Sequence, residues 1–178
     1  MIKKYLLIIL LMYFSSFSTL HAEERNAHFL LTIGHTDFKG DVFHAQGLVQ
    51  KLGGGYRFSD FVSFEVSLIS YGEVSDTNGT IETDMVGAAI ATQLMGLLPI
   101  TNSIDIFGKA GVSYWKFEIK SEDPSLVSRA TEDGSDVIYG AGFLFRVDHD
   151  STLRLEYELS DIGGIDIAAI SFGIQHQF

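Results

Sequence analysis

The chain has 178 residues, of which 46% are hydrophobic and 20% are charged, so its composition indicates one folded domain and excludes a disordered chain. The 12 Lys and Arg residues stand against 23 Asp and Glu, and the net charge of −11 excludes the basic face that a nucleic-acid binder requires. Because the chain has no Cys, disulfide scaffolds, thiolate metal sites and Cys nucleophiles are excluded as well.

The first 22 residues have the features of a secretory signal peptide. Lys3 and Lys4 form a positively charged start, and an uninterrupted apolar run follows over residues 5–14. This run is too short to span a bilayer as a helix, and small polar residues ending in Ala22 come next. We therefore expect cleavage after Ala22, which leaves residues 23–178 as a single mature barrel domain.

Apolar and polar side chains alternate with a period of two through the rest of the chain, which is the pattern of β-strands with two unlike faces. Val62 and Phe64, for example, fall on one face, whereas Ser63 and Glu65 fall on the other. The alternation predicts eight strands, at 28–38, 48–58, 61–71, 83–98, 104–117, 137–147, 152–159 and 168–178. Most of them have the length of about ten residues that a tilted membrane-spanning strand needs.

Residues 85–104 carry no formal charge and would be flagged as a transmembrane helix in a sliding-window scan. Thr92 and Gln93 interrupt the middle of this stretch, and residues 99–103 have the composition of a turn. We therefore interpret it as the end of one strand, a turn, and the start of the next strand at Ile104.

Short and long connections alternate between the predicted strands. Turns are expected at 59–60, 99–103 and 148–151, longer polar loops at 39–47, 72–82 and 118–135, and a short fourth loop at 160–164. This order is that of an up-and-down barrel whose termini lie on the side of the short turns. The predicted fold is therefore all-β, an eight-stranded antiparallel up-and-down transmembrane β-barrel.

The volume of the interior decides which face of each strand points outward. An eight-stranded barrel is only just wide enough for side chains to fill it, so the many large apolar residues do not all fit inside. No charge stands among the central apolar positions, where Lys or Arg in lipid would cost about 2–4 kcal/mol. Within the opposite, inward set, Glu65, Lys109, Arg146 and Glu156 are expected to form an interior ion-pair network. A gated ion pathway through the same residues is the alternative.

Short segments rich in Gly and aromatic residues recur along the predicted strands. They are GGYRFSD at 54–60, FGKAGVSY at 107–114, YGAGF at 139–143 and LEY at 155–157. In this order they resemble the small outer-membrane β-barrels of Gram-negative bacteria, the OmpA-like and OmpX/Ail-like family. Phe172, Gly173, Ile174 and Phe178 resemble that family's C-terminal assembly signal, although His176 stands where an apolar residue is usual.

The resemblance implies a location in the Gram-negative outer membrane, with both termini in the periplasm. It implies as partners outer-membrane lipid, lipopolysaccharide, the outer-membrane assembly machinery, and a host or surface ligand of the extracellular loops. The expected function is a non-catalytic structural or surface-interaction role of the adhesion or resistance type. The alternative is a small pore or a lipid A-modifying enzyme in the outer membrane.

Candidate catalytic and metal-binding residues are few. The His-x-Ser pair that a lipid A deacylase needs occurs only as His149-Asp150-Ser151, in a predicted turn on the inner side of the membrane. His35 and His44 lie near the first long loop without a cluster of further ligands. The acidic loops lack the spacing of a specific cation site and are typical of a solvated surface. We therefore expect no catalytic residue, no metal site and no cofactor.

Overall fold

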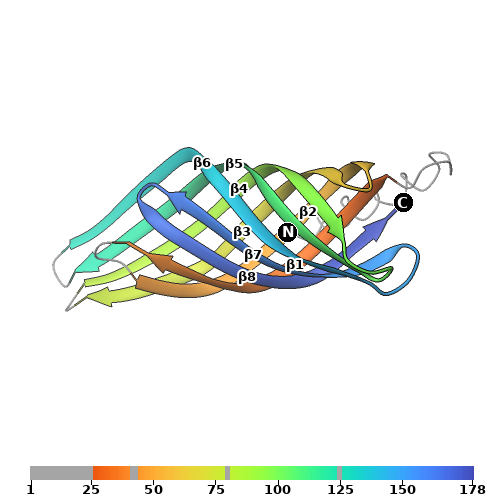
Figure 1. Cartoon of the computed structure of the whole chain (residues 1–178). Helices are drawn as coiled ribbons and strands as arrows, with labels where there is room; N and C mark the ends of the chain where they lie inside the picture. Colours follow the sequence, from red (N-terminus) through yellow and green to blue (C-terminus); the bar gives the residue numbers. More distant parts are fainter. Residues whose placement is uncertain (1–25, 41–43, 79–80, 124–125) are drawn as a thin grey trace, which may run out of the picture.

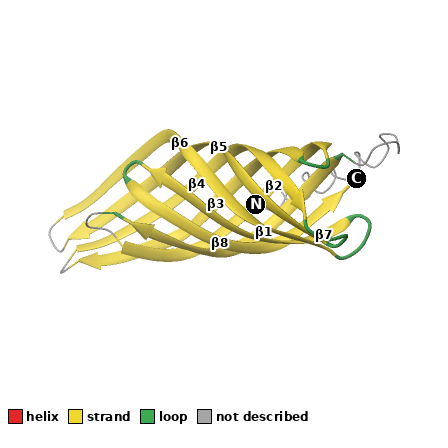
Figure 2. Cartoon of the chain, in the orientation of Figure 1, coloured by secondary structure: helices red, strands yellow, loops and turns green. Residues whose placement is uncertain are grey.

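The computed structural model describes residues 26–40, 44–78, 81–123 and 126–178, and the predicted signal peptide lies outside them. Each strand is hydrogen-bonded to its neighbours in sequence, and the last strand pairs with the first to close an antiparallel barrel (Figure 1 and Figure 2). The strands are β1 (Ala27–Lys39), β2 (His44–Ser59), β3 (Val62–Asn78), β4 (Ile81–Pro99), β5 (Ile104–Asp123), β6 (Leu126–Arg146), β7 (Ser151–Ile162) and β8 (Ile165–Gln177). The predicted eight-stranded barrel is thereby confirmed.

Residues 85–104 form most of β4, a turn and the first residue of β5, as the interruption by Thr92 and Gln93 predicted. Among the described residues, no helix is long and apolar enough to cross a membrane. Gln93 is buried and donates a hydrogen bond to Glu158 at 3.2 Å, so this polar side chain is satisfied inside the barrel.

The register of the strands is staggered around the barrel. The path of paired residues that leaves β5 at Tyr114 passes through Leu68 on β3 and Leu31 on β1 and returns to β5 at Ile104, ten residues nearer the N-terminus. Such a stagger tilts the strands relative to the barrel axis. Every residue on this path is apolar or aromatic, so the path lies within one continuous apolar outer surface.

Large apolar side chains cover the outside of the barrel, and charged ones lie within it. On β5, Val112 and Tyr114 are 39% and 61% exposed, whereas the intervening Ser113 is fully buried and Lys109 is 4% exposed. This distribution is the reverse of that in a soluble protein, and it fits strands whose outer face contacts lipid. The assignment of faces from the sequence alternation agrees with these exposures.

The predicted long loops are mostly strand, which corrects the sequence interpretation. Residues 118–135 belong almost entirely to β5 and β6, which pair without a break from Ile104↔Phe145 to Asp123↔Leu126. The acidic composition of this segment suggested a loop. Backbone hydrogen bonds between two strands do not require an apolar face, however, so a polar hairpin forms where no lipid is contacted.

Candidate functional site

Six charged side chains from four strands meet in the middle of the barrel interior, and we call them the ion cluster. Its members are Lys51 on β2, Glu65 on β3, Lys109 on β5, and Arg154, Glu156 and Glu158 on β7. All six are buried, and their three positive and three negative charges balance. The charges of a buried cluster need to balance, because an unpaired charge in this environment costs roughly several kcal/mol.

Arg154 lies at the centre of the ion cluster. Its guanidinium donates to the two carboxylate oxygens of Glu65 at 2.6 and 3.0 Å, and its Nε donates to Glu156 at 2.7 Å. The guanidinium carbon is 4.5 Å from the centroid of the Phe107 ring, a distance at which the ring face attracts a cation. Arg154 therefore joins β7 to β3 across the interior.

The two lysines neutralise the rest of the carboxylate charge. Lys109 Nζ lies 2.9 Å from Glu156, 2.7 Å from Glu158 and 3.9 Å from Glu65. Lys51 forms ion pairs with Glu156 and Glu158. Each glutamate of the ion cluster consequently faces at least two cations.

Three of the four residues expected in the interior network, Glu65, Lys109 and Glu156, lie within ion-pair reach in this cluster. The structure corrects the placement of the fourth. Arg146 ends β6 near the short turns, where it donates to both carboxylate oxygens of Asp105 at 2.7 Å and to the backbone oxygen of Asn102.

Height along the strand separates Arg146 from the ion cluster. The β6 residue paired with Lys109 is Gly140, six positions before Arg146, and a Cβ at Gly140 would lie 2.8 Å from the side chain of Glu158. A glycine at this level of β6 therefore leaves room for the cluster. The alternation of the sequence predicts which side a residue faces but not its level, and Lys51, Arg154 and Glu158 were missed for that reason.

Apolar side chains pack on both sides of the ion cluster in the interior. Toward the long hairpins, Phe38, Tyr71 and Phe117 pack with ring centroids 5.5–6.4 Å apart. Toward the short turns, the layer consists of Met95, Leu97, Phe107 and Leu144. Buried polar side chains border the ion cluster on the short-turn side as well, since His28 lies 3.3 Å from Glu65 and Gln175 accepts a hydrogen bond from Arg154.

The residues considered for catalysis or metal binding lie at the β6–β7 connection and on β1 and β2. His149 and Asp150 lie in the β6–β7 turn and Ser151 begins β7, and Asp148 accepts hydrogen bonds from the backbone N–H groups of Asp150 and Ser151. His35 is exposed, with Nε2 at 3.9 Å from Asp37. In the part of the chain that the structure describes, no group of His, Asp and Glu side chains could hold a metal ion.

The residues of the predicted assembly signal lie on or next to β8. Phe172 and Ile174 point outward and are 57% and 52% exposed, and the backbone N–H of Phe178 donates to Ala27 at 2.9 Å. Gly173 faces the seam with β1, where a Cβ would lie 2.0 Å from the backbone oxygen of Leu31. A larger residue at Gly173 would therefore push apart the pair of strands that closes the barrel.

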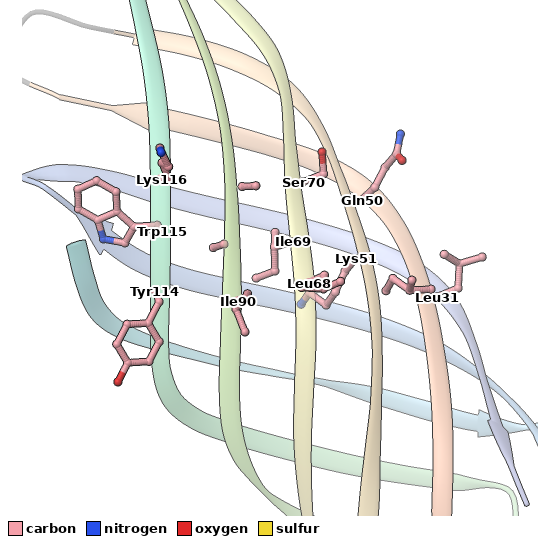
Figure 3. A pocket seen from close by; sticks show the side chains of 13 residues that line it. Leu31, Gln50, Lys51, Leu68, Ile69, Ser70, Ile90, Tyr114, Trp115 and Lys116 are labelled. Atoms are coloured by element: carbon pink, nitrogen blue, oxygen red, sulfur yellow. The ribbon is translucent and has the colours of Figure 1, made fainter. Parts of the chain in front are cut away.

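A depression of about 720 Å³ lies on the outer face over β1 to β5 (Figure 3). It forms where the small side chains of Ser70 and Ala88 stand among the larger Leu31, Leu68 and Tyr114. This depression belongs to the surface that contacts lipid, and the mostly apolar lining suits acyl chains.

Four strands continue beyond the other four at the long-hairpin end (Figure 1). Strands β3 to β6 have 17 to 21 residues, whereas β7 and β8 have 12 and 13. The pairing of β6 with β7 ends at Ile138↔Ser160, and the pairing of β3 with β2 ends at Tyr71↔Val49. The residues of β3 to β6 beyond these pairs form what we call the projecting sheet.

Comparison with known proteins gives the same architecture. A family model described as the outer membrane protein beta-barrel domain matches residues 7–178. Outer membrane protein A of Salmonella typhi is 25% identical over 138 residues, which are 70% of this chain and 38% of that protein. Outer membrane protein A of Klebsiella pneumoniae is 28% identical over 137 residues, with coverages of 70% and 39%. The chain thus matches less than half the length of these curated relatives.

Solved structures with low sequence identity share the fold. Neisserial surface protein A superposes with a TM-score of 0.68 at 18% identity, covering 85% of this chain and 97% of that one. The attachment invasion locus protein Ail of Yersinia pestis, solved with the heparin analogue sucrose octasulfate, has a TM-score of 0.61 at 15% identity, covering 86% and 99%. OprG of Pseudomonas aeruginosa has a TM-score of 0.62 at 14% identity, covering 86% and 96%.

Proposed function

Because the chain belongs to the outer membrane protein beta-barrel domain family, we propose that it is a non-catalytic surface-interaction protein of the Gram-negative outer membrane. In this proposal the projecting sheet lies outside the cell and both termini lie in the periplasm. The assembly machinery binds the C-terminal strand, on or next to which Phe172, Ile174 and Phe178 are exposed.

The projecting sheet is the observation that carries this proposal. It extends past the apolar outer surface and ends in hairpins rich in charge, so its length is not needed to cross the bilayer. Pairing along the whole β5–β6 hairpin holds it in a defined shape. Ordering a long sheet beyond the membrane costs conformational entropy. A binding role at the cell surface explains why the chain keeps such a sheet.

The charge of the projecting sheet favours a cationic partner. Residues 72–86 contain four acidic and no basic residues, and residues 115–137 contain six acidic and three basic ones. The Ail structure named above holds a sulfated ligand, and the acidic balance here would repel such an anion. We therefore expect positively charged surfaces of proteins or peptides to bind this chain in preference to sulfated polysaccharides.

A shortened β5–β6 hairpin tests the proposed role. In the variant, an Asn-Gly turn replaces residues 120–129, so that the pair Ile119↔Ala130 flanks a tight turn. Cells that display the wild type should attach to surfaces coated with basic protein, and cells that display the variant should attach at least severalfold less. Equal amounts of heat-modifiable protein in the outer-membrane fraction serve as the control for folding. Equal attachment by both strains would contradict the proposed role of the sheet.

A further inference from the structure

The side of β6 that faces away from β5 is unpaired over its outer part. The backbone N–H of Arg146 donates to Ser103 next to β5, and that of Val147 donates to Ser151 next to β7. Because successive residues of a strand direct their backbone groups to opposite sides, the odd-numbered residues of β6 face β7. The β6–β7 pairing ends at Ile138↔Ser160, so the odd-numbered residues between Arg129 and Ser135 face an open edge.

This open edge is regular and accessible. Arg129, Thr131, Asp133 and Ser135 direct their N–H and C=O groups to it, and within the described ranges of the chain no backbone hydrogen bond is made to them from that side. All four residues are exposed. The β7–β8 turn packs toward the interior, where Gly163 lies against the buried Trp115.

The opposite edge of the projecting sheet is less suited to pairing. The register of β3 with β4 shifts between Tyr71 and Val74, where a β-bulge interrupts the strand just as it leaves β2. Such bulges twist an edge away from a straight partner, and they are one means by which proteins block edge-to-edge association. No shift occurs along β6, so β6 presents the straighter edge.

Acidic side chains surround the base of the open β6 edge. A depression of about 580 Å³ lies there on the outer face, and its lining includes Asp37, Asp161 and Asp166, with Lys39 as a basic residue. Asp161 and Asp166 are directly opposed partners of the β7–β8 pair. Like charges in that arrangement are destabilising, and a positive charge from a partner would relieve the repulsion.

We propose that the open edge of β6 binds an extended, basic segment of a partner protein by strand addition. Main-chain hydrogen bonds from Arg129 to Ser135 would hold the added strand, and its Lys or Arg side chains would lie next to the carboxylates at the base of the edge. This inference rests on the surface role proposed above and names the kind of partner.

The experiment uses the full mature chain in lipid nanodiscs and a labelled ten-residue peptide with Lys alternating with Val. Fluorescence anisotropy measures affinity, and amide hydrogen exchange locates the bound strand. We expect binding, with slower exchange at residues 129–135. A peptide N-methylated at alternate residues, which lacks half of the donors, should bind at least tenfold more weakly, as should a peptide with Glu in place of Lys.

Two pairs of variants separate the contribution of edge hydrogen bonds to peptide binding from the contribution of charge. Thr131→Pro removes an edge N–H but leaves the β5 ladder intact, and it should weaken peptide binding at least tenfold, whereas the matched Thr131→Ala should not. Asp166→Asn should weaken binding severalfold at low salt, whereas the remote Asp148→Asn should not. Heat-modifiable migration confirms that each variant is folded.

Several outcomes would overturn the inference. They are no binding by the wild type, full binding by Thr131→Pro, equal binding of the Glu peptide, protection on β3 instead of β6, and self-association of the chain through this edge. If the peptide fails while cells still attach to basic surfaces through the β5–β6 hairpin, strand addition is wrong and the surface role stands. If both fail, the proposed function is wrong as well.

Discussion

Arg154 shows how one side chain organises the interior of this barrel. It contacts carboxylates of β3 and β7 while its guanidinium carbon lies over the Phe107 ring, and it is fully buried, so water cannot substitute for any lost partner. The Arg146 side chain, by contrast, is 37% exposed at the rim. Its partner Asp105 also lies 4.0 Å from the guanidinium of a second arginine, Arg57. The same residue type therefore carries a different energetic weight at the two places.

We predict that Arg154→Ala destabilises the barrel by about 3–5 kcal/mol, the range for breaking a buried ion pair. Arg146→Ala should cost less, roughly 1–3 kcal/mol, because Asp105 retains a nearby cation and water reaches the site. Urea unfolding in lipid vesicles measures both values. A larger loss from Arg146→Ala than from Arg154→Ala would contradict the assignment of Arg154 as the central cation.

Double-mutant cycles identify which pairs interact. Glu65→Ala and Arg154→Ala should be coupled by at least about 1 kcal/mol, because these residues are in direct contact. Glu65→Ala and Arg146→Ala should be additive to within roughly 0.5 kcal/mol, because Arg146 bonds Asp105 at another level of the barrel. Coupling of the second pair alone would restore the network expected from the sequence.

The elements themselves were predictable wherever lipid or the interior constrains both faces. Alternation around Glu65 and Lys109 assigned the inward face, and exposure in the structure agrees. Strand ends were not predictable beyond the lipid, because polar residues on both faces of a strand, as at the successive Lys120 and Ser121, have no period to detect. The level of each charge was also hidden, since it depends on the stagger between strands rather than on any local pattern.

We predict that Phe64→Arg or Val112→Arg impairs insertion, at a cost of about 2–4 kcal/mol near the middle of the bilayer. Ser63→Arg should also be disruptive, because Ser63 is fully buried and donates to the backbone of Tyr56 in a filled interior. Folding yield into vesicles, read by heat-modifiable migration, checks all three. Tyr114→Phe is the matched outward control, and it should fold as the wild type does.

At the scale of the whole molecule, buried side chains of the described residues occupy the barrel interior at three levels. A neutral ion cluster occupies the middle, and apolar side chains such as Phe117 and Leu144 close both ends. Ions that enter an apolar constriction lose hydration without gaining ligands, so such layers oppose conduction. This arrangement supports the surface role over the pore alternative.

We predict that the wild type produces no large, steady unit conductance in planar bilayers. Replacing Phe38 and Phe117 together by Ala should open the layer next to the long hairpins and raise the frequency or size of conducting events. Phe64→Ala, on the outer face, is the control and should leave the conductance unchanged. A wild type that conducts as strongly as the double variant would favour the pore.

The ion cluster has a consequence for the order in which the barrel is built. Lys51 and Glu65 lie near the start of the chain and Arg154 near its end, and they come within reach only when β8 pairs with β1. Until that moment Lys51 and Glu65 lack their partners on β7, although Arg154 and Glu156 already share that strand, and both end strands still have open edges. The last step of assembly therefore removes both the cost of unpaired interior charges and the cost of unpaired strand edges. Partly assembled barrels are consequently not expected to accumulate. Completion is cooperative because the barrel closes and these ion pairs form in the same step.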